Sequence, residues 1–135
     1  MERQYNFWVV VEPTKGVAGE WTAHVLEVDV VTQGRSIKHA FDMAIEAAAI
    51  VVGDDLRAKR DPLTRRAPDR FWKRLQRVVE GGSPVRLSAL RQKVARRIMV
   101  AGQVHLRLTP ARARSVRGDV PFAFKRALTK ETAAA

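Results

Sequence analysis

The stretch YNFWVVVEP, residues 5–13, predicts the first element of the fold. It is rich in aromatic and β-branched residues and ends at a proline, which is typical of a β-strand. Side chains alternate between the two faces of such a strand. One face therefore receives Phe7, Val9 and Val11, and the other receives Trp8 and Val10.

Two more strands are expected directly after it. The segment TKGVAGE, residues 14–20, carries two glycines and predicts a hairpin loop. The segment WTAHVLEV, residues 21–28, again alternates and predicts a second strand. A short third strand over residues 30–33 should end at Gly34, which accepts a positive φ without steric cost.

From Ser36 the period of the apolar residues changes to that of an amphipathic helix. The apolar positions are Ile37, Ala40, Phe41, Ala44, Ile45, Ala48 and Val52. Ser36 is the expected N-cap, and Gly53 is the expected stop. The pattern predicts an α+β fold, a three-stranded antiparallel sheet with one packed helix (β-β-β-α).

The order of these elements resembles the N-terminal domain of HicB-family antitoxins. That family has a tyrosine-led strand ending in glutamate, a G-x-(W/Y)-x-(A/V) strand, a Thr-Gln-Gly turn and a helix with Glu-Ala near its end. This sequence supplies YNFWVVVE at 5–12, GEWTAHV at 19–25, VTQG at 31–34 and Glu46-Ala47. The resemblance covers residues 5–53.

The resemblance implies an antitoxin of a type II toxin–antitoxin system. Residues 1–87 would be the HicB-like domain that binds and neutralises a HicA-type, mRNA-cleaving toxin, and the protein would repress its own operon by binding operator DNA. The alternative is an orphan HicB-type domain that acts as a non-enzymatic nucleic-acid-binding protein without any toxin.

The charge of the chain is strongly divided. The 25 lysines and arginines exceed the 14 acidic residues by 11, but residues 1–56 carry a net charge of −5 and residues 57–135 a net charge of +16. A basic half of this size indicates an acidic partner, nucleic acid first and an anionic surface second. A basic surface that serves only solubility is the alternative.

The basic half begins with residues 54–68, a connector or insertion with two prolines and little periodicity. A second helix is expected from Asp69, its predicted cap, to Gly81-Gly82. Its polar face is basic and carries Arg70, Lys73, Arg74 and Arg77. Residues 84–87 predict a fourth strand that returns to the sheet.

Residues 88–130 form a basic C-terminal region, expected to bind nucleic acid or to dimerise. Ser88 begins a predicted third helix that ends near Gly102, and residues 104–110 alternate as a strand. We expect this strand to be a plain edge strand or part of a dimer contact, and its resemblance to the strand of a ribbon-helix-helix DNA-binding motif is the alternative. The expected DNA-binding residues, mostly for phosphates, are Arg91, Lys93, Arg96, Arg97 and Arg107. We expect a homodimer or higher oligomer, and a disordered tail over residues 131–135.

No constellation of catalytic residues is found, so we expect a protein that is not an enzyme and needs no metal or cofactor. There is no cysteine, and the three histidines lack metal-ligand spacing. Asp42 and Glu46 share a helix face and leave a degenerate, metal-dependent nuclease as a third hypothesis. The longest apolar run, residues 47–52, is too short to span a membrane, and the start lacks a secretory pattern. A cytoplasmic location is therefore expected.

Overall fold

The structure, a computed structural model, describes residues 3–89, 98–109 and 112–127. This part of the chain forms one six-stranded antiparallel sheet in the order β3-β2-β1-β5-β6-β4. Its strands are β1 (Arg3–Pro13), β2 (Trp21–Val25), β3 (Val30–Gly34), β4 (Ser83–Val85), β5 (Ile98–Thr109) and β6 (Arg112–Ala127). The helices are α1 (Ile37–Arg57) and α2 (Asp69–Gly81), with short 3-10 turns η1 (Pro62–Arg65) and η2 (Leu87–Ala89).

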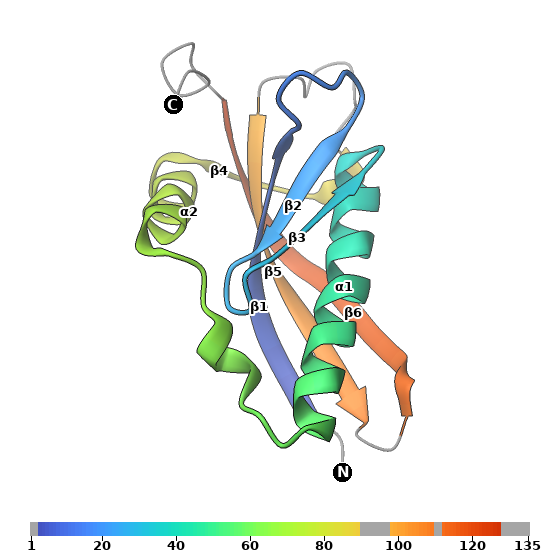
Figure 1. Cartoon of the computed structure of the whole chain (residues 1–135). Helices are drawn as coiled ribbons and strands as arrows, with labels where there is room; N and C mark the ends of the chain where they lie inside the picture. The colour runs from blue at the N-terminus through green and yellow to red at the C-terminus, as the bar shows by residue number, and fades with distance from the viewer. Residues whose placement is uncertain (1–2, 90–97, 110–111, 128–135) are drawn as a thin grey trace.

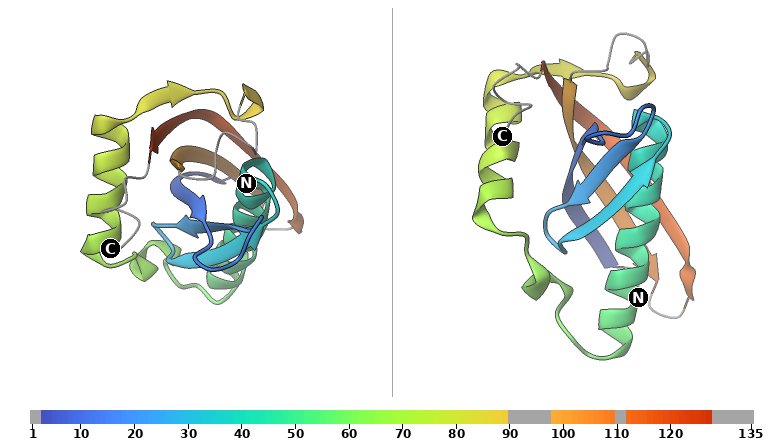
Figure 2. Two further views of the ribbon diagram at one scale, coloured as in Figure 1. Left: turned by 90° about the horizontal axis from the view of Figure 1, so that it is seen from above. Right: turned by 45° about the horizontal axis from the view of Figure 1, so that its top comes forward.

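The two helices lie on opposite faces of the sheet (Figure 1). Seen from above, the sheet curves around α1, whereas α2 crosses its outer side (Figure 2). The connector from α1 to α2 runs past the end of the sheet, so the chain changes face within it. Each helix therefore covers its own hydrophobic core.

The larger core lies between α1 and the inner face of the sheet. Alternate residues of β1, namely Phe7, Val9 and Val11, meet Phe41 and its neighbours on α1. The same face of β5 contributes Val104, Leu106 and Leu108. In this arrangement the apolar side of the period-two strands and that of the period-3.6 helix are buried against each other.

A second, smaller core lies between α2 and the outer face. Leu75 and Val78 of α2 are buried against Val10, Met99 and Ala101 of the sheet. Half-buried aromatic residues surround this core: Trp8, Phe71, Trp72 and Phe124. The amphipathic helix predicted after the connector is thereby confirmed.

The α+β class is confirmed, but the predicted three-stranded sheet is wrong in extent, since three further strands join it. The reason is that the free side of β1 pairs with β5 over nine residue pairs, from Arg3↔Leu108 to Val11↔Val100. A sheet edge with unpaired backbone groups is stabilised by such an additional strand. The returning strand expected at 84–87 is found as β4, and it pairs with β6 at the far edge.

Helix boundaries differ from the expected ones at two places. Gly53 does not end the first helix, because its backbone is buried and α1 continues to Arg57. A glycine inside a helix costs only about 1 kcal/mol, which such burial offsets. Asp69 is not the N-cap of α2. Pro68 takes that position, without a side-chain hydrogen bond.

The C-terminal region differs most. Residues 98–102, expected as the end of a helix, belong to β5, and residues 90–97 lie outside the described part. Because β5 has β1 on one side and β6 on the other, it is neither an edge strand nor free to pair with a second subunit. The ribbon-helix-helix interpretation is therefore wrong, and the residues after the predicted ribbon form β6 instead of a helix.

The expected boundary at 87/88 falls inside this single sheet. The tail predicted at 131–135 lies outside the described residues. Neither α1 nor α2 has the length and hydrophobicity needed to cross a membrane, and the described residues hold no other candidate helix.

Candidate nucleic-acid interface

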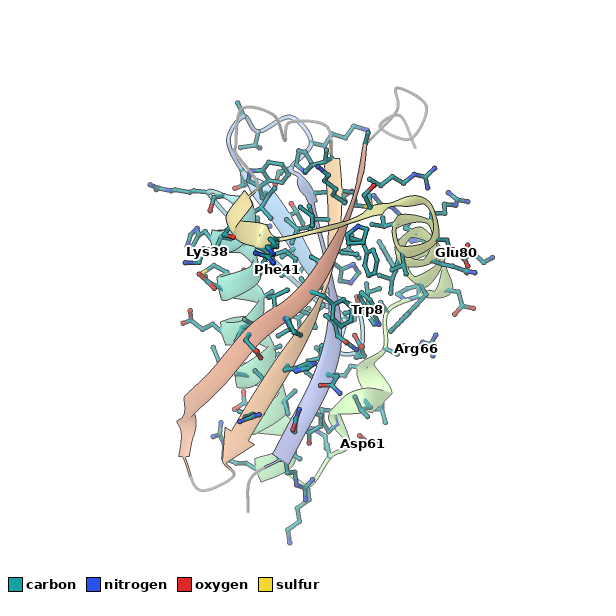
Figure 3. The ribbon with its side chains drawn as sticks, turned by 180° about the vertical axis from the view of Figure 1, so that it is seen from behind. Trp8, Lys38, Phe41, Asp61, Arg66 and Glu80 are labelled. Atoms are coloured by element: carbon teal, nitrogen blue, oxygen red, sulfur yellow. The ribbon has the colours of Figure 1, made fainter. Side chains whose placement is uncertain are left out.

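The outer face of the sheet is only partly covered by α2. Beyond the helix, the strands β1, β5 and β6 continue with no described helix over them (Figure 3). The uncovered positions are those that alternate with the buried ones of the inner core. We call this surface the open face, and it comprises Gln4, Asn6, Trp8, Gln103, His105, Arg107 and Phe122.

Strand register places the residues of the open face in rows. Trp8 pairs with Gln103, and Gln103 pairs in turn with Phe122. The next row joins Asn6 to His105. The row beyond joins Gln4 to Arg107. Amide, imidazole and guanidinium groups thus stand beside two aromatic rings.

The aromatic row is accessible to solvent. Phe122 is 45 % exposed, although it is a large apolar residue. Its ring meets the half-buried ring of Trp8 edge to face, with 5.9 Å between the ring centres. Phe124 lies next to it, at 6.0 Å. An exposed aromatic surface of this kind on a folded protein frequently marks a binding surface.

The partly buried carboxylate of Glu27 binds the backbone of Trp8. The backbone N–H of Trp8 donates to Glu27 Oε1 at 2.8 Å and to Oε2 at 3.0 Å. Burial raises the pKa of Glu27 to about 7, although this hydrogen bond and the Arg66 charge act in the opposite direction. Arg66 therefore lies within electrostatic reach of Glu27, which binds the backbone of the open face at Trp8 (both Trp8 and Arg66 are labelled in Figure 3).

Basic side chains lie along the solvent-facing side of α2 and on the loop directly before this helix. Arg66, Arg70, Lys73 and Arg77 are all exposed. Two guanidinium groups are held against aromatic rings, Arg66 at 4.4 Å from the Trp72 ring centre and Arg70 at 4.7 Å from that of Phe71. We call these four residues the basic ridge. Asp69 and Glu80 are the acidic residues of the same helix.

A pocket with a volume of about 390 Å³ lies between α2 and strands β1 to β3. Of its charged side chains, Arg74 is paired with Glu12, and His24 Nε2 lies 2.7 Å from Asp29 Oδ1. Arg70 of the basic ridge also lines the pocket. The edge of the His24 ring packs on Phe71, with 4.6 Å between the ring centres. Both carboxylates that line the pocket, Glu12 and Asp29, are therefore already engaged by side chains of the protein.

The residues that the sequence predicted for DNA binding are only partly described. Arg91, Lys93, Arg96 and Arg97 lie outside the described residues. Arg107 is exposed and belongs to the open face. The basic side predicted for the second helix is found in the basic ridge, except that Arg74 is engaged by Glu12.

The hypothesis of a metal-dependent nuclease receives no support from the residues that the structure describes. Asp42 and Glu46 are exposed on α1, and within residues 3–89, 98–109 and 112–127 no three His, Asp or Glu side chains gather as metal ligands. The three histidines lie apart. His24 is in the pocket, His39 accepts from the Arg35 N–H at 2.9 Å, and His105 is on the open face.

Trp8, Gln103 and Phe122 were not recognised as a site from the sequence. Their only sequence signal is alternation, which marks Trp8 as lying opposite the buried Phe7 and Val9. No protein-family model matches this chain, and no curated protein or solved structure shows significant similarity to it.

Proposed function

We propose that this protein is a nucleic-acid-binding protein without an active site of its own. The observation that carries the proposal is the basic ridge, since its cations are exposed along one side of α2. The opposite side of the helix is fixed to the sheet by the buried Leu75 and Val78. A rigid row of cations is suited to contact successive phosphates.

Pairing within the protein distinguishes the ridge from four arginines of α1, the connector and α2. Arg57, Arg60, Arg65 and Arg74 each form a salt bridge with a carboxylate. The described structure shows no such bridge for Arg66, Arg70, Lys73 or Arg77. Their charge is available to an external anion, and the sequence-wide excess of basic residues adds a field of the same sign.

The experiment is a titration of labelled duplex and single-stranded oligonucleotides at 50 and 200 mM salt. We expect binding that weakens steeply with salt, because each phosphate contact releases counterions. The double variant Lys73→Gln/Arg77→Gln should bind more weakly. Its matched control is Lys15→Gln/Lys38→Gln, which removes the same charge from exposed positions in the hairpin loop and on α1. Equal loss in both variants would contradict a localised interface.

A HicB-like antitoxin is the second candidate. It is supported by the sequence elements of the resemblance and by their order, in which Thr32, Gln33 and Gly34 end β3 directly before α1. It is also supported by the separation of charge, since Asp42 and Glu46 are exposed on α1 while the basic ridge lies on the other side of the sheet. A basic toxin and a nucleic acid could then be bound simultaneously, and complementary charge would favour both encounters.

This candidate predicts a specific partner and a specific DNA. A HicA-type toxin should co-purify with the protein, and the double variant Asp42→Lys/Glu46→Lys should weaken that complex. The protein should also prefer its own promoter fragment over a scrambled duplex, as a homodimer or higher oligomer. If it binds both duplexes equally and no toxin binds, the orphan nucleic-acid-binding protein is the remaining form of the proposal.

A further inference from the structure

We propose that the open face binds single-stranded nucleic acid, with bases stacked on Phe122 and Trp8 and phosphates along the basic ridge. The inference rests on the proposed function and deepens it, because it names the form of nucleic acid and the residues that contact the bases. It adds the open face on strands β1, β5 and β6 to the basic ridge of α2, on which the proposed function rests.

The aromatic row has the geometry of a stacking platform. Phe122 and Trp8 lie in register on strands separated by β5, with Gln103 between them, and both rings are on the outer face. Bases are flat and apolar on their faces, so they gain by covering exposed rings. Aromatic side chains on the open side of a sheet bind single-stranded RNA in this manner in other protein modules.

The remaining residues of the open face match the edges of bases. Asn6 and Gln103 each offer an amide donor and an amide acceptor, and His105 adds a ring nitrogen. These groups can pair with the hydrogen-bonding edges that a base exposes when it is not in a duplex. The exposed Asp119 of β6 is the strand partner of His105.

Duplex DNA fits this surface poorly. The major groove, about 12 Å wide, admits an α-helix or a two-stranded ribbon. Here the central strand β5 is flanked on both sides by long strands, so it cannot be inserted into a groove. A duplex could reach the basic ridge through its phosphates but could not place its bases on Phe122.

Two cations, Arg66 and Arg107, are available for phosphates near the open face. Arg66, the first residue of the ridge, is electrostatically coupled to Glu27, the carboxylate that binds the Trp8 N–H. Arg107 provides a second exposed cation at the other end of the open face. A strand whose bases lie on the aromatic row therefore finds cations on both sides for its phosphates.

The test compares three labelled probes of equal length: a single-stranded RNA dodecamer, the same sequence as DNA, and an abasic strand with the same phosphates. We expect both base-containing strands to bind at least about tenfold more tightly than the abasic one. The variant Phe122→Ala should lose roughly this factor for the base-containing strands while leaving abasic binding unchanged. The variant Phe122→Tyr, which keeps an aromatic ring, should keep the tighter binding of the base-containing strands.

The matched control is Ile50→Ala, which shortens another exposed apolar side chain, on α1 at the opposite side of the sheet. Its binding should equal that of the unaltered protein. Equal affinity for abasic and base-containing strands would overturn this inference but leave the proposed function intact. Absence of binding to every strand and to duplex would overturn both.

Discussion

The backbone N–H of Trp8 is bound by the side chain of Glu27 and not by a neighbouring strand. The ladder between β1 and β2 ends at Val9↔Val25, and the Leu26 N–H still reaches the Trp8 carbonyl at 3.0 Å. The chain then turns away, so Glu27 supplies the acceptor that a longer β2 would have supplied. This carboxylate allows β1 to extend beyond β2 into the open face.

The Glu27 carboxyl should make stability depend on pH. Burial raises its pKa to about 7 from an ordinary value of 4.5, so the folded protein binds the proton more tightly than the unfolded chain. The resulting stabilisation is fully present below about pH 4.5 and is lost as the pH rises through about 7. The loss is on the order of 3 kcal/mol.

The measurement is the free energy of unfolding by denaturant between pH 5 and 8, for the protein and for Glu27→Gln. The amide keeps an acceptor for the Trp8 N–H but does not titrate. The difference between the two proteins should therefore change across this range in favour of the variant at pH 8. Parallel pH profiles would show that Glu27 has no raised pKa.

Asp55 should be far more important for stability than its neighbour Asp54. Asp55 is 1 % exposed and accepts hydrogen bonds from Arg65 Nε at 2.8 Å and from Arg60 Nε at 3.1 Å, which fixes the connector to the end of α1. The Arg65 hydrogen bond holds the pKa of Asp55 below its ordinary range, so this stabilisation is present above that range and is lost in acid.

The test is the thermal midpoint of Asp55→Asn beside that of Asp54→Asn. Asp54 is exposed and pairs only with Arg57 on the surface of α1, and such pairs contribute little. We expect a clear fall of the midpoint for Asp55→Asn and almost none for Asp54→Asn. Similar midpoints would contradict a structural role for the Asp55 cluster.

Gly34 should not tolerate a side chain. A Cβ atom there would lie 2.4 Å from the Ala40 backbone nitrogen and 2.7 Å from its Cα, and neither atom can rotate away. Gly34→Ala should therefore destabilise the protein by about 1–3 kcal/mol or more. Gly81→Ala is the control in a denaturant titration, since the nearest atom to its Cβ would be Arg126 Cζ, at an ordinary 3.7 Å.

Arg107 should contribute to binding through phosphate contacts. It is exposed at the end of the open face and pairs across the sheet with Gln4. Removing one phosphate contact should lower the slope of log affinity against log salt by about 0.7 for a single strand. We expect this change for Arg107→Gln in a salt titration, and an unchanged slope for Lys38→Gln on α1.

Local patterns predicted the elements of the first half well. The strand around Phe7, the third strand and the helix after Ser36 all occur where alternation or helical spacing placed them. The helix containing Leu75 and Val78 was equally evident from its apolar side. Errors arose where a local signal competed with burial, as at Gly53, which was expected to end a helix and instead lies buried inside α1.

Only the basic part of the candidate site was predictable from the sequence, because the aromatic part depends on contacts between distant segments. The cations of α2 stand at helical spacing in one short segment, so the sequence alone indicated a basic helix face. The aromatic row needed the pairing of β1 with β5 and of β5 with β6, which brings Trp8 and Phe122 together from opposite ends of the chain. No local periodicity encodes which strand pairs with which.

The sequence by itself determined the alternation of each strand and the amphipathic helices, because these properties depend on residues within a few positions of one another. It also determined the excess of positive charge, which is a sum over all residues. Tertiary structure alone decided that β5 inserts beside β1 and that α2 covers only part of the outer face. Those choices follow from burying the most apolar surface over the whole chain. They are also what leaves Phe122 exposed beside Trp8 on the outer face.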